Sequence, residues 1–522
     1  MSTTSPRVAL RADASQIMGV GHVRRCISLG IALQNVGVRV VLVTRDLGVD
    51  LTWMAQSSSV ELLRLPAPRA TESATDRVPH ASWAGVGWLQ DASETSMLLR
   101  DWRPDWVIVD EYAFDSRWHR YLHEALRVRV GIVDDLADRD LYCEILVDHN
   151  VHQNHRQKYL NRIGNETFIL GGPRFALLDV KYSRASPYIV NETVKSIGIF
   201  MGGIDAAQLS GLALRACRRI ADFRGLIEIV TTRANPNGEK LKVLAAEWPD
   251  TVVTFDLPDL AEFFARHDLQ IGAGGGANLE RCCVGAPALV LAAAANQEAV
   301  LPELRTQGAI ALFIPSPMRN EKRLGQAIRA LINSSSARRI LSERARALVD
   351  GFGAKRVALQ IASTWLRVRS AKMSDARMIY EWRSHPVTRA TARISDEFGL
   401  PEHDRWMRKM VFDGQSILLV GVVGMVDVGV IRFDIDSREK GRATVSLYLD
   451  PQLHGLGLGT ALLRAGEGFV LKHISENMRF VATIVDGNES SKRMFASSGY
   501  SLSGGQWEKH MVLSSMGGVI YQ

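Results

Sequence analysis

Near its N-terminus the chain reads Arg11-Ala-Asp13-Ala-Ser-Gln-Ile-Met-Gly19-Val-Gly21-His22-Val-Arg-Arg25-Cys26. An apolar run precedes this stretch and a segment with helical periodicity follows it, so we interpret it as a strand end, a glycine loop and a first helical turn. Glycines let a backbone approach a ligand, and free N–H groups at a helix start attract anions. Alone, such a loop is weak evidence for a nucleotide site.

The pattern around this loop decides the fold class. Short apolar runs alternate with helical segments such as His22–Gln34 and Arg117–Arg127, and the alternation restarts after residue 190. It predicts α/β architecture, namely two Rossmann-like lobes of parallel strands, with ligands beyond the carboxyl ends of the strands. The predicted strands are Arg7–Leu10, Val38–Val43, Trp106–Val109, Val130–Val133, Glu144–Val147, Ser196–Phe200, Ile227–Thr231, Val252–Phe255, Leu269–Ile271 and Ala288–Leu291.

A second glycine loop occurs in the second lobe, where the chain reads Ile271-Gly-Ala-Gly-Gly-Gly276-Ala-Asn278-Leu-Glu280. A diphosphate fits on the amides of such a loop, and Glu280 is placed to accept hydrogen bonds from ribose hydroxyls. Alternatively, Glu280 only stabilises the first helical turn. Two such loops on two sheets indicate a nucleotide cleft.

His22 is the candidate catalytic residue of the first loop. The positive end of a helix dipole favours a neutral imidazole, which can accept a proton at pH 7. A purely structural histidine at a helix start is the alternative.

Seven motifs in order resemble a known family, the UDP-2,4-diacetamido-2,4,6-trideoxy-β-L-altropyranose hydrolases of pseudaminic acid biosynthesis. These are relatives of the glycosyltransferase that adds N-acetylglucosamine in peptidoglycan synthesis, so the resemblance implies lobes of GT-B type. The motifs are the Arg11 stretch, Val109-Asp-Glu111-Tyr112, Val133-Asp-Asp-Leu-Ala137, Gly172-Pro-Arg174-Phe175-Ala-Leu-Leu178, Met201-Gly202-Gly203-Ile-Asp205, the Glu280 loop and Asn296-Gln297-Glu298.

The resemblance implies metal-independent, inverting attack of water on the anomeric carbon, with release of UDP. His22 would be the base, Asn278 and Glu280 would hold the uridine diphosphate, and Asn296 and Gln297 would line the sugar pocket. Glu111 stands where family members often carry His, which leaves the identity of the sugar open. The other expected contacts to the UDP-sugar are Arg11, Asp13, Gly21, Tyr112, Arg174, Phe175, Gly202 and Gly203.

Metal and redox sites are not expected in these lobes. His149, His152 and His155 are clustered, but no Cys or carboxylate completes a ligand set. Asp134-Asp135 fits a strand-end turn, and Cys282-Cys283 fits helix packing.

The pattern changes near Ser363–Leu366. Here a strand at Leu366–Arg369 and a short helix at Asp375–Arg383 precede a run of strands. We expect those strands at Ile417–Val423, Asp427–Phe433, Ala443–Leu449 and Met478–Val485. The segment Ser334–Ala362 before them is predicted to be helical.

A third glycine loop follows the strand Ala443–Leu449 and precedes the apolar helix Ala461–Phe469. Its pattern Gln-x-x-Gly-x-Gly forms a pyrophosphate cradle of backbone amides. With the later stretch Asn488-Glu-Ser-Ser-Lys-Arg-Met-Phe495-Ala-Ser-Ser-Gly-Tyr500, it resembles the GNAT superfamily of N-acetyltransferases. The resemblance implies acetyl-CoA as co-substrate, bound by Leu449, Gln452, Gly455, Leu456, Gly457, Leu458, Gly459, Thr460, Asn488 and Phe495.

Phe495 stands where many members place a Tyr that protonates the departing thiolate, and Phe cannot donate a proton. The segments around Arg383 and Trp406 resemble the subgroup that acetylates amino sugars on nucleotides. The acceptor residues implied are Glu381, Trp382, Arg383, His403 and Trp406. Ordinary packing and surface charge are the alternative for these residues.

Bulk composition restricts compartment and partners. The net charge is +7, but no basic block or zinc-finger spacing accompanies it, which favours phosphorylated ligands over nucleic acid. No apolar run approaches about 20 residues, and the short polar segment Met1–Arg7 does not fit a signal peptide. Five cysteines fit a reducing cytoplasm. We expect a cytoplasmic protein without membrane partners; its oligomeric state stays open.

The predicted domains are residues 1–180 and 181–362, two lobes of a hydrolase, and residues 363–522, a GNAT domain. The leading hypothesis is an enzyme that acetylates a UDP-4-amino sugar and hydrolyses a UDP-diacetamido sugar. The alternative is a GT-B glycosyltransferase with a non-catalytic GNAT docking module.

Overall fold

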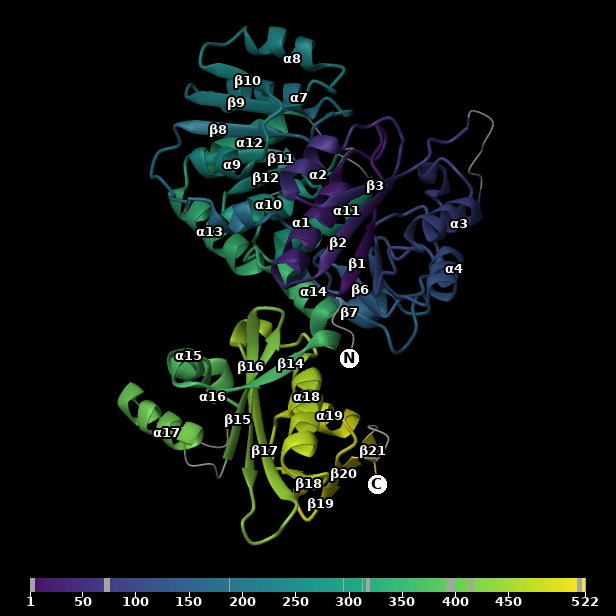
Figure 1. Cartoon of the computed structure of the whole chain (residues 1–522). Helices are drawn as coiled ribbons and strands as arrows, with labels where there is room; N and C mark the ends of the chain where they lie inside the picture. The colour runs from purple at the N-terminus through teal and green to yellow at the C-terminus, as the bar shows by residue number, and fades with distance from the viewer. Residues whose placement is uncertain are drawn as a thin grey trace. The chain divides into compact units, whose positions relative to one another are not determined.

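The computed structural model describes residues 5–69, 76–186, 188–293, 295–311, 313–315, 320–391, 399–412, 416–513 and 519–521. The chain divides into two compact units. One comprises Arg7–Ala32 and Val40–Val357, and the other comprises Ala358–Gln522 with two short N-terminal segments. Each unit is considered separately below (Figure 1).

The first lobe is built on a seven-stranded sheet. In spatial order its strands are β3 (Glu61–Leu65), β2 (Arg39–Arg45), β1 (Arg7–Arg11), β4 (Trp106–Val109), β5 (Arg129–Val133), β6 (Ile145–Asp148) and β7 (Phe168–Gly171). Its helices are α1 (Gly21–Asn35), α2 (Thr52–Ser58), α3 (Trp88–Leu99), α4 (Ser116–Leu126), α5 (His155–Lys158) and α6 (Val180–Arg184).

The centre of this sheet brings two strand ends together. β1 and β4 are parallel neighbours, with Arg11 opposite Val109, so the residues that follow each strand leave the same edge. Val107 and Val109 are fully buried in the core together with Trp118 of α4. Apolar runs buried on both faces are typical of parallel strands, which explains why the sequence pattern identified them.

The second lobe has a six-stranded, wholly parallel sheet. In spatial order its strands are β10 (Thr251–Phe255), β9 (Leu226–Thr231), β8 (Ser196–Phe200), β11 (Leu269–Ala273), β12 (Ala288–Leu291) and β13 (Phe313–Ile314). Its helices are α7 (Leu209–Arg215), α8 (Gly238–Ala245), α9 (Ala261–Arg266), α10 (Ala277–Val284), α11 (Ala295–Thr306), α12 (Glu321–Ile332) and α13 (Ser335–Leu348), followed by α14 (Gly353–Ala362). Figure 1 shows β8, β9 and β10 side by side.

The C-terminal domain has a mixed eight-stranded sheet. Its strands are β14 (Arg367–Ser370), β15 (Ser416–Val423), β16 (Val426–Ile435), β17 (Arg442–Leu449), β18 (Asn477–Ala482), β20 (Gln506–Leu513) and β19 (Ser501–Ser503), with β21 (Val519–Tyr521) paired to β20. Its helices are α15 (Ala376–Ser384), α16 (Pro386–Arg389), α17 (Leu400–Phe412), α18 (Leu458–His473) and α19 (Glu489–Ser497). The parallel pair β17–β18 is hydrogen-bonded only from Arg442 to Thr444, so the rest of β17 separates from β18.

The predicted fold class is confirmed, since two parallel Rossmann-like sheets precede a mixed GNAT-type sheet. The segment Ser334–Ala362 is helical as predicted, and it forms two helices, because α13 ends at Leu348 and α14 starts at Gly353. A β-carbon at Gly353 would lie 2.3 Å from the carbonyl oxygen of Ala176, so this close approach requires glycine. Strands β3, β7, β13, β19, β20 and β21 were not predicted.

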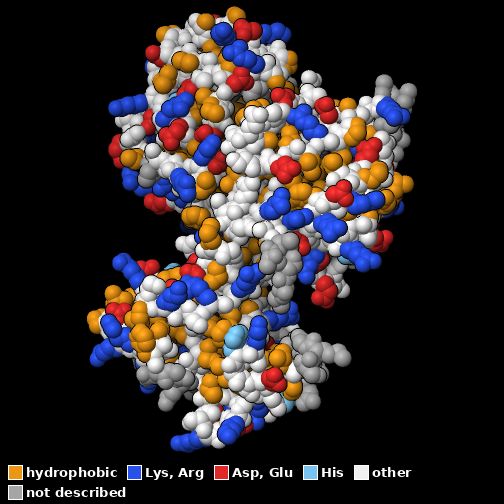
Figure 2. All heavy atoms as spheres, viewed as in Figure 1, with side chains coloured by type: hydrophobic (Ala, Val, Ile, Leu, Met, Phe, Trp, Pro, Cys, Tyr) orange, Lys and Arg blue, Asp and Glu red, His pale blue; other side chains and the backbone are white. Residues whose placement is uncertain are grey.

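The surface carries both signs of charge. On the face drawn in Figure 2, Lys and Arg side chains are interspersed with Asp and Glu. None of the helices within the described residues has the length and apolar character needed to cross a membrane.

Asp91 of α3 is a fully buried carboxylate in the first lobe. Its Oδ2 accepts hydrogen bonds from Nη2 of Arg11 at 2.7 Å and from Nη2 of Arg45 at 2.8 Å. Its Oδ1 accepts a third from Nε1 of Trp118 at 3.0 Å. Burial would raise the pKa of Asp91, but the two guanidinium groups outweigh burial and hold that pKa below its ordinary value.

We expect Asp91→Asn to destabilise the first lobe by about 3–5 kcal/mol, because it leaves two buried guanidinium groups without their shared counter-charge. Urea unfolding monitored by circular dichroism measures this loss. Asp140→Asn is the matched control, since Asp140 is 61% exposed where it pairs with Arg162, and we expect it to leave the midpoint unchanged. Equal midpoints for both variants would contradict the assigned role of Asp91.

Candidate functional site

His22 lies in the first turn of α1, buried beside two aromatic rings. Its Nδ1 lies 2.6 Å from Oδ1 of Asp110, and its ring meets that of Tyr112 edge-on, with centroids 4.7 Å apart. Within the described residues no hydrogen bond engages Nε2. A proton on Nδ1, donated to the carboxylate, leaves the lone pair of Nε2 available as a base.

Asp110 follows β4 and is fully buried. Arg25, one turn after His22, forms two hydrogen bonds with this carboxylate: Nε donates to Oδ2 at 2.9 Å, and Nη2 donates to Oδ1 at 2.7 Å. The same Nη2 lies 2.9 Å from Nδ1 of His22, so the three groups form one cluster. Burial raises the pKa of Asp110, but the charges of Arg25 and His22 outweigh it and hold the pKa below its usual range. Asp110 is therefore ionised and orients His22.

Glu111, the next residue, has the opposite character. It is 1% exposed, its Oε1 accepts a bond from the Ala113 amide at 3.2 Å, and its Oε2 has no hydrogen-bond partner within the described residues. Burial, and next the charge of Asp13, raise the pKa of Glu111 to about 7. A half-satisfied buried carboxyl group beside the His22–Asp110 pair is able to hold a proton near neutral pH.

A second ring of polar groups surrounds this cluster. Tyr112 donates a hydrogen bond to Oδ1 of Asp135, and Nδ2 of Asn150 donates to Oδ2 at 2.9 Å. Burial, and next Arg25, lower the pKa of His149 to about 4, which keeps that imidazole neutral.

No group of three or more His, Cys, Asp or Glu with the geometry of a metal site occurs in the described part of the chain.

Arg11 and Asp13, predicted to contact the UDP-sugar, are 1% and 0% exposed. Nη2 of Arg11 donates to Oδ2 of Asp13 at 2.8 Å, and Asp13 also accepts a bond from the backbone amide of Arg45 at 2.6 Å. The structure thus gives these two side chains a buried structural role, and their contact with a ligand stays a prediction.

The second glycine loop, Gly272–Gly276, joins β11 to α10. Asn278 is buried, and its Oδ1 accepts a bond from Nη2 of Arg281 at 3.1 Å, whereas its Nδ2 has no partner within the described residues. Glu280 is hydrogen-bonded to Tyr182, and burial raises the pKa of Glu280 while Arg24 lowers it. Arg24 belongs to α1 of the first lobe, so the two predicted loop regions act on each other electrostatically.

Sequence reasoning missed Arg281, which lies beneath this loop. Its side chain is 1% exposed, and its Nη2 donates to the carbonyl of Ala273 at 2.7 Å. A β-carbon at Gly272 would lie 2.0 Å from Nη1 of Arg281, so this glycine gives the guanidinium its space. Nε and Nη1 have no hydrogen-bond partners among the described residues, and burial lowers the pKa of Arg281 to about 10. A buried cation at a helix start strengthens an anion site.

Other predicted contacts flank the strand ends. β-carbons at Gly21, Gly202 and Gly276 would meet no atom within 4 Å, so these loops border open space. Oε1 of Gln297 accepts a bond from the Ala293 amide at 2.8 Å. Arg174 is exposed, and its guanidinium carbon lies 5.2 Å from the centroid of the buried Phe175 ring. The carbonyl of Gly203 accepts a hydrogen bond from the hydroxyl of Thr232 at 2.9 Å. The side chain of Asn296 lies outside the described residues.

The third glycine loop, between β17 and α18, fits a pyrophosphate. Gly455 and Gly457 have φ of 79° and 69°, the left-handed region that favours glycine. The amides from Gly455 to Gly457 donate to no backbone carbonyl of the described residues. They remain available to an anion at the N-terminus of α18, a helix of 16 residues. Leu456, Leu458 and Gly459 are buried, Leu449 and Thr460 are half-buried, and the amide of Gln452 donates to Asp450 at 3.0 Å.

Two further residues predicted to bind acetyl-CoA have structural partners. Asn488 caps α19, its Oδ1 accepting from the Ser491 amide at 3.1 Å. Phe495 is 5% exposed and packs on Tyr500, with centroids 4.8 Å apart. The hydroxyl of Tyr500 donates to Glu467 at 2.7 Å, inside the core. Contacts of Asn488 and Phe495 with acetyl-CoA stay predictions.

Four of the five predicted acceptor residues gather on one side of the C-terminal sheet. Trp382 and Trp406 pack on the apolar cluster around Met407, and Arg383 lies 5.0 Å over the ring of Trp406. His403 is buried and contacts the carbonyl of Ala376 through Nε2 at 2.9 Å. Glu381 is exposed and pairs with Arg377 at 3.0 Å.

Comparison with known proteins supports the assignment of the C-terminal domain. Residues 369–500 match the model of the acetyltransferase (GNAT) family. The C-terminal domain is of the GNAT type. The matched residues include β17, the glycine loop and α18.

The chain has curated relatives. It is 28% identical over 198 residues to the spore coat polysaccharide biosynthesis protein SpsG of Bacillus subtilis (strain 168), covering 37% of this chain and 58% of SpsG. It is 20% identical over 293 residues to the uncharacterized protein MJ1062 of Methanocaldococcus jannaschii, covering 55% of each chain. The chain thus spans little more than half the length of these relatives. The crystal structure of Acinetobacter baumannii MurG has 16% identity and a TM-score of 0.44, covering 68% of this chain and 98% of MurG.

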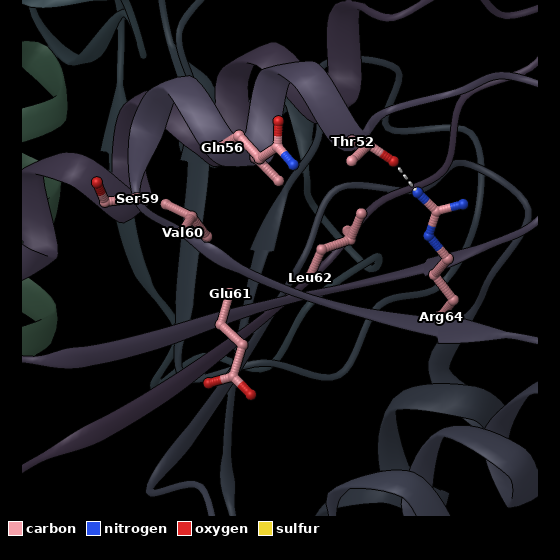
Figure 3. A pocket seen from close by; sticks show the side chains of 8 residues that line it. Thr52, Gln56, Ser59, Val60, Glu61, Leu62 and Arg64 are labelled. Carbon is pink, nitrogen blue, oxygen red and sulfur yellow. Dashed lines mark hydrogen bonds between the residues drawn. The ribbon is translucent and has the colours of Figure 1, made fainter.

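A hollow with a volume of about 430 Å³ lies elsewhere, against α2 and β3 (Figure 3). Its lining includes Thr52, which accepts a hydrogen bond from Arg64, and the buried Val60. None of the predicted site residues lines it, so we assign it no role in the chemistry.

We expect the carboxyl group of Glu111 to titrate near pH 7 in the folded chain. Because the folded pKa lies above the unfolded value, the folded state binds more protons than the unfolded state between about pH 4.5 and 7, and stability falls as pH rises through that window. Carbon-13 NMR of labelled glutamate side chains measures the titration. Glu111→Gln should remove one resonance titrating near 7, whereas Glu61→Gln, at the exposed end of β3, should not. A spectrum in which Glu111 titrates near 4 would refute this.

Proposed function

We propose that the chain is a bifunctional enzyme acting on UDP-linked amino sugars. Its GNAT domain acetylates the 4-amino group of a UDP-4-amino-trideoxyhexose, and its two lobes hydrolyse the resulting UDP-2,4-diacetamido-2,4,6-trideoxyhexose to free sugar and UDP. The observation that carries the hydrolase assignment is the 2.6 Å contact of His22 with Asp110, which leaves Nε2 available. The name of SpsG, a spore coat polysaccharide biosynthesis protein, agrees with a nucleotide-sugar substrate.

In the hydrolytic step, Nε2 of His22 takes a proton from water as the water oxygen bonds to the anomeric carbon. The bond from that carbon to the diphosphate oxygen breaks with inversion, releasing UDP. The ionised Asp110 stabilises the imidazolium until its proton returns to solvent. The charge developing on UDP is met by the amides at the start of α10 and by Arg281 beneath them.

In the acetylation step, the amine of the sugar attacks the thioester carbon of acetyl-CoA, the C–S bond breaks and CoA leaves with the amine proton. The chain's contribution is positioning, since the loop Gly455–Gly457 offers free amides to the pyrophosphate. Phe495 cannot protonate the thiolate, but a thiol with a pKa of about 8.5 leaves readily without acid assistance.

A glycosyltransferase differs from a hydrolase only in which oxygen attacks the anomeric carbon. We would incubate the chain with the UDP-diacetamido sugar in ¹⁸O-labelled water, with and without cell-wall or polysaccharide acceptors, and analyse products by mass spectrometry. Label on the free sugar, and none on UDP, supports hydrolysis with C–O cleavage at the sugar. Sugar attached to an acceptor, without free sugar, would support the transferase alternative.

We expect His22→Ala to lower the hydrolysis rate by about 10²–10⁴-fold, because it removes a positioned base. Asp110→Asn should lower kcat and leave KM nearly unchanged, because an amide cannot stabilise the imidazolium. Steady-state UDP release measures both. Acetylation by the same variants is the internal control and should continue at the wild-type rate. Normal UDP release by His22→Ala would eliminate the base assignment.

Gly457→Asp should abolish acetyl transfer while hydrolysis continues, because a carboxylate at that position repels the pyrophosphate and strains a left-handed backbone. Gly468→Asp is the matched control on the same helix, since a β-carbon at Gly468 would meet no atom within 4 Å. Acetyl-CoA consumption and UDP release are followed in parallel. Acetylation by Gly457→Asp at the rate of the control would contradict a pyrophosphate site at this loop.

A further inference from the structure

The acceptor side of the GNAT domain carries a group of side chains that the proposed chemistry does not use. In the antiparallel pair β16–β17, Val430 is opposite Tyr448 and Arg432 is opposite Ser446. Paired residues, and residues two apart on one strand, share a face of the sheet, so Arg432 and Tyr448 are diagonal neighbours on one face. Val430 lies in the apolar cluster around Met407, which places this face toward α15 and α17. Figure 1 shows these helices on one side of β15 and β16, with α18 and α19 on the other.

Arg383 reaches the same place from α15. Its guanidinium stacks over Trp406 at 5.0 Å, and it is close enough to Arg432 and Tyr448 to interact with both electrostatically. Burial, and then the neighbouring positive charge of Arg432, lower the pKa of Arg383. Two guanidinium groups from different elements are thus held near each other.

The hydrogen-bonding capacity here is incomplete. The hydroxyl of Tyr448 is buried and has no partner within the described residues. Burial raises the pKa of Tyr448 although the two arginines lower it, so the phenol keeps its proton and remains a donor. Arg432 pairs with Asp434 through Nη2 at 2.9 Å, while its buried Nε has no acceptor among the described residues.

We propose that Arg383, Arg432 and Tyr448 form a phosphate-binding subsite that holds the diphosphate of the nucleotide-linked acceptor sugar. The inference rests on the proposed acetyltransferase function and adds to it the side chains that bind the diphosphate of the acceptor. Guanidinium forks match phosphate oxygens, and a phenol O–H adds a third, neutral donor. A bound phosphate ester would separate the two cations and satisfy the donors that lack partners.

The charge pattern also suits the reaction. Two guanidinium groups repel the ammonium form of an amino sugar that carries no negative charge of its own. An acceptor carrying its own diphosphate brings that counter-charge with it, whereas the free amino sugar does not. Selectivity for the nucleotide-linked substrate follows from the same groups.

The test uses the full chain and three acetylation measurements: KM for the UDP-4-amino sugar, KM for its methyl glycoside, and KM for acetyl-CoA. We expect Arg432→Met and Arg383→Met each to raise KM for the UDP-linked acceptor about ten- to a hundredfold, the loss of one charge-assisted hydrogen bond. Tyr448→Phe should raise it about two- to tenfold. KM for the methyl glycoside and for acetyl-CoA should stay unchanged.

Arg408→Met is the matched control, because Arg408 is exposed on α17 two residues from Trp406. It should change none of the three constants. A rise in KM shared by the UDP-linked acceptor and the methyl glycoside would show that the residues bind the sugar, and would overturn the proposal. A rise in KM for acetyl-CoA alone would show that these residues bind a phosphate of CoA, and would also overturn the proposal. Circular dichroism and an unchanged KM for acetyl-CoA exclude misfolding.

Equilibrium dialysis with UDP tests the subsite without turnover. The double variant Arg383→Met/Arg432→Met should bind one UDP fewer per chain than the wild type. If the double variant binds one UDP fewer but the wild-type chain acetylates no UDP-amino sugar, the phosphate subsite is supported and the proposed acetylation is rejected. Equal UDP stoichiometry in both chains would reject the subsite itself.

Discussion

The ion pair of Arg11 with Asp13 and Asp91 is the constraint on which the first lobe's site depends. Arg11 ends β1, and its carbonyl accepts the amide of Asp110 at 2.9 Å, so the fully buried guanidinium, the strand end and the partner of His22 are tied together. Burying such charges costs free energy that only well-placed partners offset. The network therefore tolerates one arrangement, and that arrangement holds Asp110 under His22.

Asp110 and Glu111 follow the same strand, but their different surroundings shift the pKa values of their carboxyl groups in opposite directions. Asp110 faces Arg25 and His22 and stays ionised, while burial, and next the carboxylate of Asp13, raise the pKa of the adjacent Glu111 to about 7. Adjacent residues of similar chemistry thereby acquire different roles, an orienting anion and a neutral donor. Glu111 is also the position at which the chain departs from the family it resembles, so this neutral carboxyl group is where we expect its preference among sugars to originate.

Most of the fold followed from the sequence because buried parallel strands leave an unmistakable apolar pattern. Ten predicted strands of the two lobes match observed strands. The edge strand Glu61–Leu65 was missed because its charged and half-exposed residues resemble a loop. The close approach of Gly353, at the start of α14, to the backbone of Ala176 could not be predicted either, because it joins residues far apart in the chain. Local composition does not encode such contacts.

In the candidate sites too, local features were predicted from the sequence, whereas contacts between distant residues were not. Glycine loops and the position of His22 are local features, and the sequence contained them. The pairing of His22 with Asp110, the buried guanidinium of Arg281 and the meeting of Arg432 with Tyr448 depend on strand order and register. Strand topology supplies the missing signal, since Asp110 directly follows the strand beside β1, and Arg432 and Tyr448 are diagonal across β16 and β17. Polar residues at neighbouring strand ends, and at diagonal positions of paired strands, are therefore the pattern that indicates such partners.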